Sequence, residues 1–207
     1  MADLILGSTT VMTESSNTVT IGNSNVALST GLSNLGGMFL VSSSSSAASV
    51  SSIDFNNTVI TPTYKTYVIH IDRIAPVAVN DELHLKLSSD NLSSFLNVTT
   101  GRIYSQQGGA GFGNEHETNV AYFQLGTDTG NDAKLGVSAE ISIYNSQDAN
   151  LSDRAGAKSV TFGRHGTHHY TWWAGCSITC TGVMNGFRIN YAGGNIAFHS
   201  VRLYGLK

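Results

Sequence analysis

Two segments in the middle of the chain show the clearest alternation of apolar and polar positions. In 67–72, Tyr67, Ile69 and Ile71 fall on one side of an extended strand, and the polar His70 and Asp72 fall on the other. In 83–87, three leucines alternate with two polar residues in the same way. A period of two predicts strands. One dry face and one wet face are typical of antiparallel sheets.

Further short apolar runs predict six more strands, which are separated by turns rich in Gly, Asn and Asp. These strands are expected at 120–125, 137–144, 159–162, 168–173, 186–191 and 196–204. No window shows ten or more residues of convincing helical periodicity. The pattern therefore predicts an all-β protein, an antiparallel β-sandwich of jelly-roll type.

Several polar stretches between these runs are expected to be connections rather than strands. The serine tract 42–46 reads as a loop between strands, and the glycine-rich segment 108–113 also reads as a loop, because so much Gly weakens a strand. A connection of a few residues is expected at 75–81. Turns are expected at 128–132 and 192–195.

The first 35 residues differ from the rest of the chain. Short apolar pairs lie there among Ser, Thr, Asn and Gly, with no sustained period. Such a segment buries little apolar surface by itself and needs a partner surface. We therefore expect 1–35 to be an extended N-terminal arm, made of short strands or extended chain, for docking and oligomerisation. The β-sandwich domain is expected over 36–207.

Composition narrows the class of function. Charged residues make up only 12% of the chain, the net charge is −3, and no Lys/Arg cluster is present. Binding to nucleic acid through a basic patch is therefore not expected. No apolar run approaches the ~20 residues needed to cross a bilayer. The first residues lack the basic start of a secretory signal, so we expect the protein to be made in a cytosol.

One histidine- and tryptophan-rich segment is the main candidate for binding chemistry. His165, His168 and His169 lie within five residues, but adjacent histidines on a straight strand point to opposite faces and do not readily share a metal. A metal site would need His165 to fold back, or subunits to meet on an axis. We expect these histidines to pack in the core or at the rim of the sandwich, and we expect neither a metal nor a cofactor.

The same strand places His169 and Trp173 on one face, and Tyr170 and Trp172 on the other. One indole should therefore lie in the core and the other at the surface or at an interface. The outward indole could stack on a sugar, since aromatic faces pack well against apolar ligand surfaces. Subunit packing is the alternative. Together with His116, these four residues are the possible ligand or interface contacts.

The remaining chemistry-bearing residues give no enzyme signature. Glu115 and Glu117 flank His116 in an expected glycine-rich loop, 106–117, which could bind a cation or a receptor. No pair of carboxylates suggests catalysis, and no Gly-x-Ser-x-Gly segment is present. Cys176 and Cys180 would be ~13 Å apart on a straight strand, too far for a disulfide. We expect two buried free thiols, although a tight turn could join them.

Four stretches resemble a family of β-sandwich modules in bacteriophage virion proteins of the tail-fibre or tail-associated type. They are Ser51-Ser52-Ile53-Asp54-Phe55; Tyr64 to Ile71 followed by Ile74-Ala75-Pro76; Leu83 to Phe95; and Gly193 to Ala197 with the segment Val201 to Lys207. The likeness covers roughly residues 49–207.

The resemblance implies a non-enzymatic structural protein of the virion, assembled in the host cytoplasm. We expect a surface or tail appendage subunit that is symmetric, such as a homotrimer, and that contacts other tail or capsid proteins and possible host-surface glycans. The alternatives are a capsid decoration or cement protein and a glycan-binding module for receptor recognition. A glycan depolymerase ranks last, because it needs two carboxylates placed across a cleft.

Overall fold

The computed structural model describes residues 3–6, 9–15, 18–21, 37–107, 111–130, 136–144, 146–147, 155–165, 168–178 and 182–207, and the account below concerns these residues. The chain divides into two compact units, 1–37 and 38–207. In the first unit, β1 (Asp3–Leu6), β2 (Thr9–Ser15) and β3 (Thr18–Ile21) pair in the order β1-β2-β3, with both ladders antiparallel. The described part of the expected arm is thus a three-stranded sheet.

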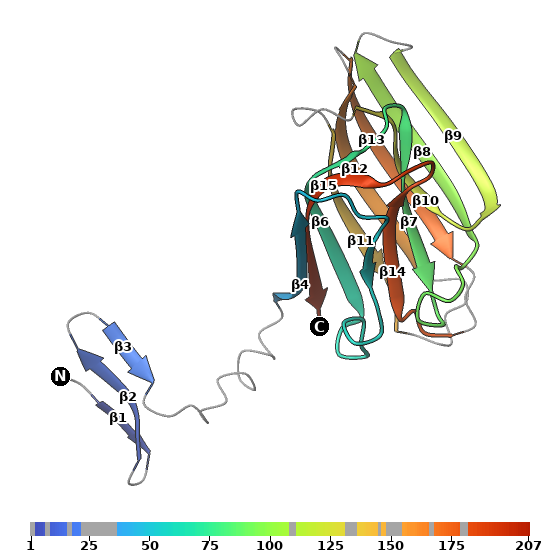
Figure 1. The fold of residues 1–207 in the computed structure, drawn as a ribbon. Coiled ribbons are helices and arrows are strands. Elements are labelled where there is room, and N and C mark those ends of the chain that lie inside the picture. Colours follow the sequence, from blue (N-terminus) through green and yellow to red (C-terminus); the bar gives the residue numbers. More distant parts are fainter. Residues whose placement is uncertain are drawn as a thin grey trace. The chain divides into compact units, whose positions relative to one another are not determined.

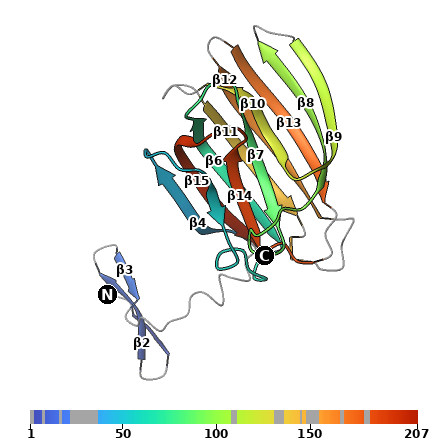
Figure 2. The same ribbon diagram turned by 45° about the vertical axis from the view of Figure 1, so that its right-hand side comes forward.

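The second unit contains two antiparallel sheets, which face one another in Figures 1 and 2. The larger sheet has eight strands in the order β4-β15-β6-β11-β12-β13-β8-β9, and the smaller has four in the order β10-β7-β14-β5. Their bounds are β4 (Met38–Ser46), β5 (Ile53–Phe55), β6 (Thr66–Pro76), β7 (Asp81–Ser88), β8 (Val98–Gln107), β9 (Gly111–Val120), β10 (Phe123–Thr129), β11 (Gly136–Tyr144), β12 (Ala155–His165), β13 (His168–Ile178), β14 (Gly186–Tyr191) and β15 (Ile196–Leu206).

A single apolar core lies between these two sheets. Ile69 and Ile141 from the eight-stranded sheet and Leu85 and Phe187 from the four-stranded sheet are all fully buried in one cluster. Tyr67 joins it, with its ring edge-on to Phe187 at a centroid distance of 5.5 Å. The alternation of apolar positions in the sequence therefore indicates which face of a strand is buried in the core. The expected all-β antiparallel sandwich is confirmed, and its jelly-roll connectivity stays a prediction.

Most of the expected strands are present. The run at 186–191 matches β14, and those at 137–144, 159–162, 168–173 and 196–204 lie within β11, β12, β13 and β15. The expected strand at 120–125 is wrong in its bounds, because β9 ends at Val120 and β10 begins at Phe123. The turn at 192–195 is confirmed. Thr129 belongs to β10 rather than to a turn, and 131–132 lie outside the described residues.

The serine tract is not a loop. Residues 42–46 form the second half of β4, where Ser43 lies opposite Arg202 and Ser44 opposite Val201 on β15. Serine has little intrinsic preference for strands, but a partner strand that supplies the ladder overrides that preference. A neutral strand thereby becomes one edge of the eight-stranded sheet.

The glycine-rich segment is also only partly a loop. Its last three residues, 111–113, begin β9, and 108–110 lie outside the described residues. Gly111, the first residue of β9, has a φ of +83°, a conformation that glycine adopts without steric cost. A Cβ at Gly113 would come within 2.4 Å of the Tyr104 ring, so glycine lets that ring cross β9. These glycines fit a strand because of the neighbours they accommodate.

The segments 67–72 and 83–87 do not lie on neighbouring strands. Residues 77–80 connect β6 in the larger sheet to β7 in the smaller one. His84 is buried rather than on a wet face, with its ring stacked 4.0 Å from Tyr122 and a ring nitrogen 3.1 Å from Glu82. His70 on β6 and His84 on β7 therefore belong to different sheets.

A matched pair of phenylalanines tests the position of the core. Phe187 is fully buried and Phe162 is 57% exposed. Phe187→Ala should lower the free energy of unfolding by about 3–5 kcal/mol, because it removes buried contacts and leaves a cavity. Phe162→Ala should change it by about 0.5 kcal/mol or less. Urea unfolding followed by circular dichroism measures both, and equal losses would contradict the described packing.

Two buried histidines predict a loss of stability in mild acid. Burial lowers the pKa of His84 and of His199 below the usual value of 6.5, although Glu82 partly offsets the effect at His84. The unfolded chain therefore takes up protons first as the pH falls, so stability is complete above about pH 6.5 and declines below it.

The urea midpoint should accordingly be lower at pH 5.5 than at pH 7.5. His84→Phe keeps an aromatic ring against Tyr122 but cannot be protonated, and it should reduce this difference. A midpoint that rises on acidification would contradict the prediction.

Candidate functional site

Strand β13 divides the aromatic candidates between two faces, as expected. Trp172 is 4% exposed and Tyr170 is also buried, whereas Trp173 is 47% exposed and His169 lies at the surface. Because Trp172 and Tyr170 are in the core, a ligand at the surface cannot contact them. Of the five candidate contact residues, Trp173, His169 and His116 stay accessible.

Trp173 lies in an apolar patch on the outer face of the eight-stranded sheet. Its cross-strand partners are Ile103 on β8 and Val160 on β12. Phe162 and Phe112 lie nearby on β12 and β9, and both are exposed. Residues directly opposite on neighbouring strands have Cβ atoms about 4.5–5.5 Å apart, so Trp173 adjoins Ile103 and Val160, whereas Phe162 and Phe112 lie opposite Thr171 and Ser105.

Beside this patch, the outer face contains two glycines that are paired across β8 and β13. Gly175 lies opposite Gly101, and His116 on β9 lies opposite Gly101 on its other side. Thr99 and Ser177 form the next outward-facing pair along these strands. We call the two glycines the glycine strip. It is a length of sheet that carries no side chains between an indole on one side and hydroxyls on the other.

The opposite half of the outer face is polar. Asp72 on β6 accepts hydrogen bonds from Ser200 at 2.9 Å and from Arg202 at 2.5 Å on β15. The Ser200 hydroxyl is the largest influence that lowers the pKa of Asp72, with the Arg202 guanidinium adding to it. A hollow of about 370 Å³ separates this half from the patch, lined by His70, Ile71, Ser138, Ala139, Glu140, Val160 and Phe162.

Glu115 and Glu117 lie on β9 and not in a loop, which corrects the sequence-based expectation. Strand alternation turns both carboxylates away from His116, toward Arg102 on β8. Arg102 is paired with Glu115 and lies 3.5 Å from Glu117, and its guanidinium is 5.3 Å from the centre of the Trp172 ring. Both carboxylates are thus engaged with a largely buried arginine, which fixes the end of the core.

Metal binding gains no support from the described residues, which contain no group of three His, Cys, Asp or Glu side chains suited to an ion. The backbone pairs His165 with His168 where β12 ends and β13 begins. The side chains of His165 and His168 lie outside the described set. The nearest cross-strand neighbour of His169 on β12 is Arg164.

Cys176 is a free thiol, and burial raises its pKa to about 11. It is therefore protonated and unreactive at neutral pH. Cys180 lies outside the described residues, so the expectation that it forms no disulfide with Cys176 stays a prediction.

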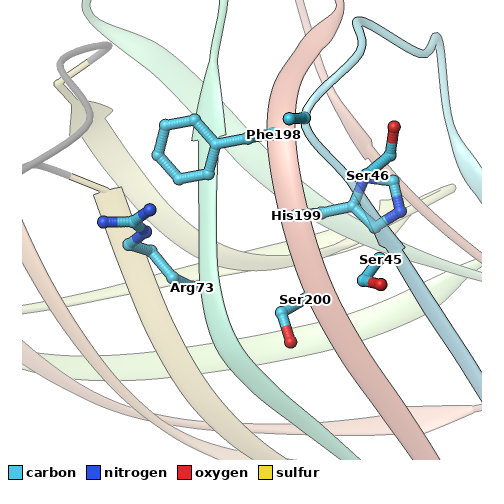
Figure 3. Close-up of a pocket in the computed structure, with 7 residues that line it drawn as sticks. Ser45, Ser46, Arg73, Phe198, His199 and Ser200 are labelled. Carbon is cyan, nitrogen blue, oxygen red and sulfur yellow. The ribbon is translucent and has the colours of Figure 1, made fainter.

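A second hollow, of about 410 Å³, lies where β6, β15 and β4 meet (Figure 3). Arg73 approaches Phe198 there, with its guanidinium carbon 4.4 Å from the ring centre. The His199 ring points toward β4, where a ring nitrogen lies 2.8 Å from Ser44 Oγ. Its Nδ1 is buried and has no hydrogen-bond partner among the described residues. Because protein atoms cover Nδ1, a ligand in this hollow would not reach it.

Comparisons with protein-family models, curated proteins and solved structures gave no match. No helix in the described part of the chain is long and apolar enough to cross a membrane.

The outer face, with Trp173 beside the glycine strip, is the best-supported candidate site on geometry alone. Sequence reasoning identified Trp173 but missed Gly101 and Gly175. Nothing in the sequence indicated them, because no strand was expected around Gly101 and the strand expected at 168–173 ends before Gly175.

Exchanging each indole separately tests the division between the two faces. Trp172→Ala should lower the free energy of unfolding by about 3–5 kcal/mol, because it opens a cavity beside Arg102. Trp173→Ala should change the free energy of unfolding by about 0.5 kcal/mol, as is usual for a substitution at the surface. Acrylamide should quench Trp173 fluorescence strongly, and Trp173→Phe should leave emission that resists quenching. Equal quenching of Trp172→Ala, which retains Trp173, and of Trp173→Phe, which retains Trp172, would contradict the division.

Proposed function

We propose that this protein is a structural subunit of a bacteriophage virion, a surface or tail appendage that assembles through its sheet edges. The observation that carries the proposal is the edge strand β4. It is nine residues long, contains no charged residue and no proline, and pairs only with β15 within the described residues. The resemblance of residues 49–207 to phage virion modules supports the same function.

The two edges of the eight-stranded sheet differ in a way that favours pairing at β4. An edge strand presents unpaired backbone groups, and proteins usually block it with charge, proline or a bulge. Both edges have a register shift, near Val120 on β9 and between Leu40 and Ser42 on β4, so the edges differ in charge: β9 has Glu115 and Glu117, and β4 has no charged residue. On β4, Met38 and Leu40 are 56% and 60% exposed, and the remaining surface is mostly serine. An open edge of this kind can accept a strand from a neighbouring subunit.

In the proposed assembly, a neighbour adds a strand to β4 and covers the exposed Met38 and Leu40 side chains. The arm, 1–35, docks on the particle, and copies form a symmetric oligomer such as a homotrimer. The sandwich points outward. A position on the capsid surface, as a decoration or cement protein, uses the same contacts. Immunogold labelling of intact particles separates the tail from the capsid.

A second candidate function is recognition of a host-surface glycan, and the exposed Trp173 indole favours it. An aromatic ring left half in water offers a flat apolar face to a ligand. The two functions are compatible, because β4 and Trp173 lie on different strands of the sheet.

Leu40→Lys tests assembly at the β4 edge. A charged side chain on the edge should oppose strand addition, so incorporation into particles should fall at least tenfold while the free energy of unfolding changes by about 0.5 kcal/mol or less. Incorporation is measured by complementing particles that lack the protein, followed by quantitative immunoblotting.

Val79→Lys is the matched control, because Val79 is an exposed apolar residue in the β6–β7 connection. It should incorporate like the unsubstituted protein. Normal incorporation of Leu40→Lys would refute assembly through β4. Failure of both variants would mean that the surface tolerates no added charge.

A further inference from the structure

The two ends of the β4 edge have complementary shapes. At the first end, the apolar side chains of Met38 and Leu40 project into solvent, with 56% and 60% of their surface exposed. At the other end, Ser45 and Ser46 form one side of the 410 Å³ hollow, whose remaining walls come mainly from β15 and β6 (Figure 3). One strand thus has both an apolar projection and a hollow. A contact between two identical edges requires such self-complementarity.

A bulge in β4 places the projection and the hollow on the same face of the sheet. Four residues of β4 lie opposite alternate residues of β15. They are Met38, Leu40, Ser43 and Ser45, which lie opposite Leu206, Tyr204, Arg202 and Ser200. Alternate residues of a strand share a face, so these four share one as well. It is the outer face, because Val201 and Leu203, which come between on β15, are buried in the core.

We propose that β4 pairs with β4 of a second copy of the chain, antiparallel and about a two-fold axis between Val41 and Ser42. Met38 then lies opposite the partner's Ser45, and the two eight-stranded sheets join into one. The inference rests on the proposed assembly at β4 and names the neighbour that adds the strand. The contact at this edge is two-fold, so a homotrimer would need contacts on other surfaces.

The bulge favours this register over its neighbours. A sheet continues only where residues of the same face meet, because a slip of one residue turns every side chain to the wrong face. A slip of one would bring Met38 opposite the partner's Ser46, which lies on the inner face opposite His199. A slip of two would oppose Ser42 and the partner's Ser43, which lie on different faces. The proposed register avoids both conflicts.

The hollow provides a place for the projecting methionine. Arg73 and Phe198 form its far side, with the guanidinium carbon 4.4 Å from the ring centre. In the proposed pair, the partner's Met38 extends over Ser45 toward Phe198. Methionine is flexible enough to fill an irregular space, and its sulfur packs favourably against an aromatic ring. The two-fold axis repeats this contact, so each copy both gives and receives a methionine.

The distribution of charge favours a second copy at this edge. Because β4 has no charged residue, two β4 strands meet without opposing like charges. Two β9 edges would instead bring the carboxylates Glu115 and Glu117 of each copy together. A charged strand from another protein would find no opposite charge on β4 itself. The strand that suits this edge is neutral and has an apolar residue near one end, and β4 is such a strand.

Disulfide cross-linking of the full-length protein tests the register. Leu40→Cys combined with Ser43→Cys should give a dimer on a non-reducing gel after mild oxidation, because the two positions meet between copies. Within one copy they are about 10 Å apart along the strand, too far to bond to each other. Leu40→Cys combined with Ser45→Cys is the matched control and should give at least tenfold less dimer. The unsubstituted protein sets the background from its native cysteines.

Analytical ultracentrifugation measures the same contact without a cross-link. At tens of micromolar, the unsubstituted protein should sediment with twice the chain mass of 21.9 kDa. Ser45→Lys should raise the dissociation constant of the dimer at least tenfold, because it places a charge opposite the partner's Met38. Val79→Lys adds the same charge at an exposed position away from this edge, and it should dissociate like the unsubstituted protein.

A monomer at these concentrations, with no cross-link above the control, would overturn the inference. Equal cross-linking of the two double variants, or a dimer unchanged by Ser45→Lys, would also overturn it, because another strand or surface would then join the copies. If the protein is a monomer and Leu40→Lys still prevents incorporation, β4 receives a strand from another virion protein, and the proposed assembly outlasts this inference. If the dimer forms as expected and Leu40→Lys incorporates normally, the two-fold pair stands and assembly of the particle through β4 is refuted.

Discussion

The structure of the larger unit depends on covering one face of each strand with apolar side chains from the opposite sheet. Successive side chains of a strand point to opposite faces, so the interior strands of the eight-stranded sheet contribute one set to the core and one set largely to solvent, whereas the edge strands β4 and β9 contain no fully buried residue. Fully burying a large apolar side chain contributes about 1.5–3 kcal/mol. The buried set, which includes Ile69, Ile141 and Trp172, therefore accounts for much of the stability. The outer set is free to vary without unfolding the protein.

That freedom explains why the outer face can hold features that a core would exclude. Trp173, Phe112 and Phe162 are exposed there, next to two glycines with open space above them. The same reasoning separates the two sheet edges. The β9 edge has carboxylates paired with a buried arginine, whereas the β4 edge is neutral along its whole length. Both proposals place the function where side chains are least constrained by the fold.

The alternation of apolar residues in the sequence predicted the sandwich and most of its strands, because burial on one face imposes a period of two. It also predicted that Trp172 and Trp173 would part to opposite faces. The serine tract and Gly111–Gly113 were misread, since their strand conformation depends on partners that are remote in sequence, β15 and β8. His84 was misplaced for a related reason. Its burial depends on Tyr122, which local pattern does not reveal.

The position of β15 has a consequence for how the protein reaches its native state. This strand lies between β4 and β6, and it contacts β4 through residues as distant as Ser44 and His199, which are 155 positions apart. During translation, β4 and β6 leave the ribosome long before the strand that must join them. Contacts between such distant residues slow folding and lengthen the time for which incomplete sheets are exposed. The nascent chain should therefore depend on chaperones until residues 196–206 have been made.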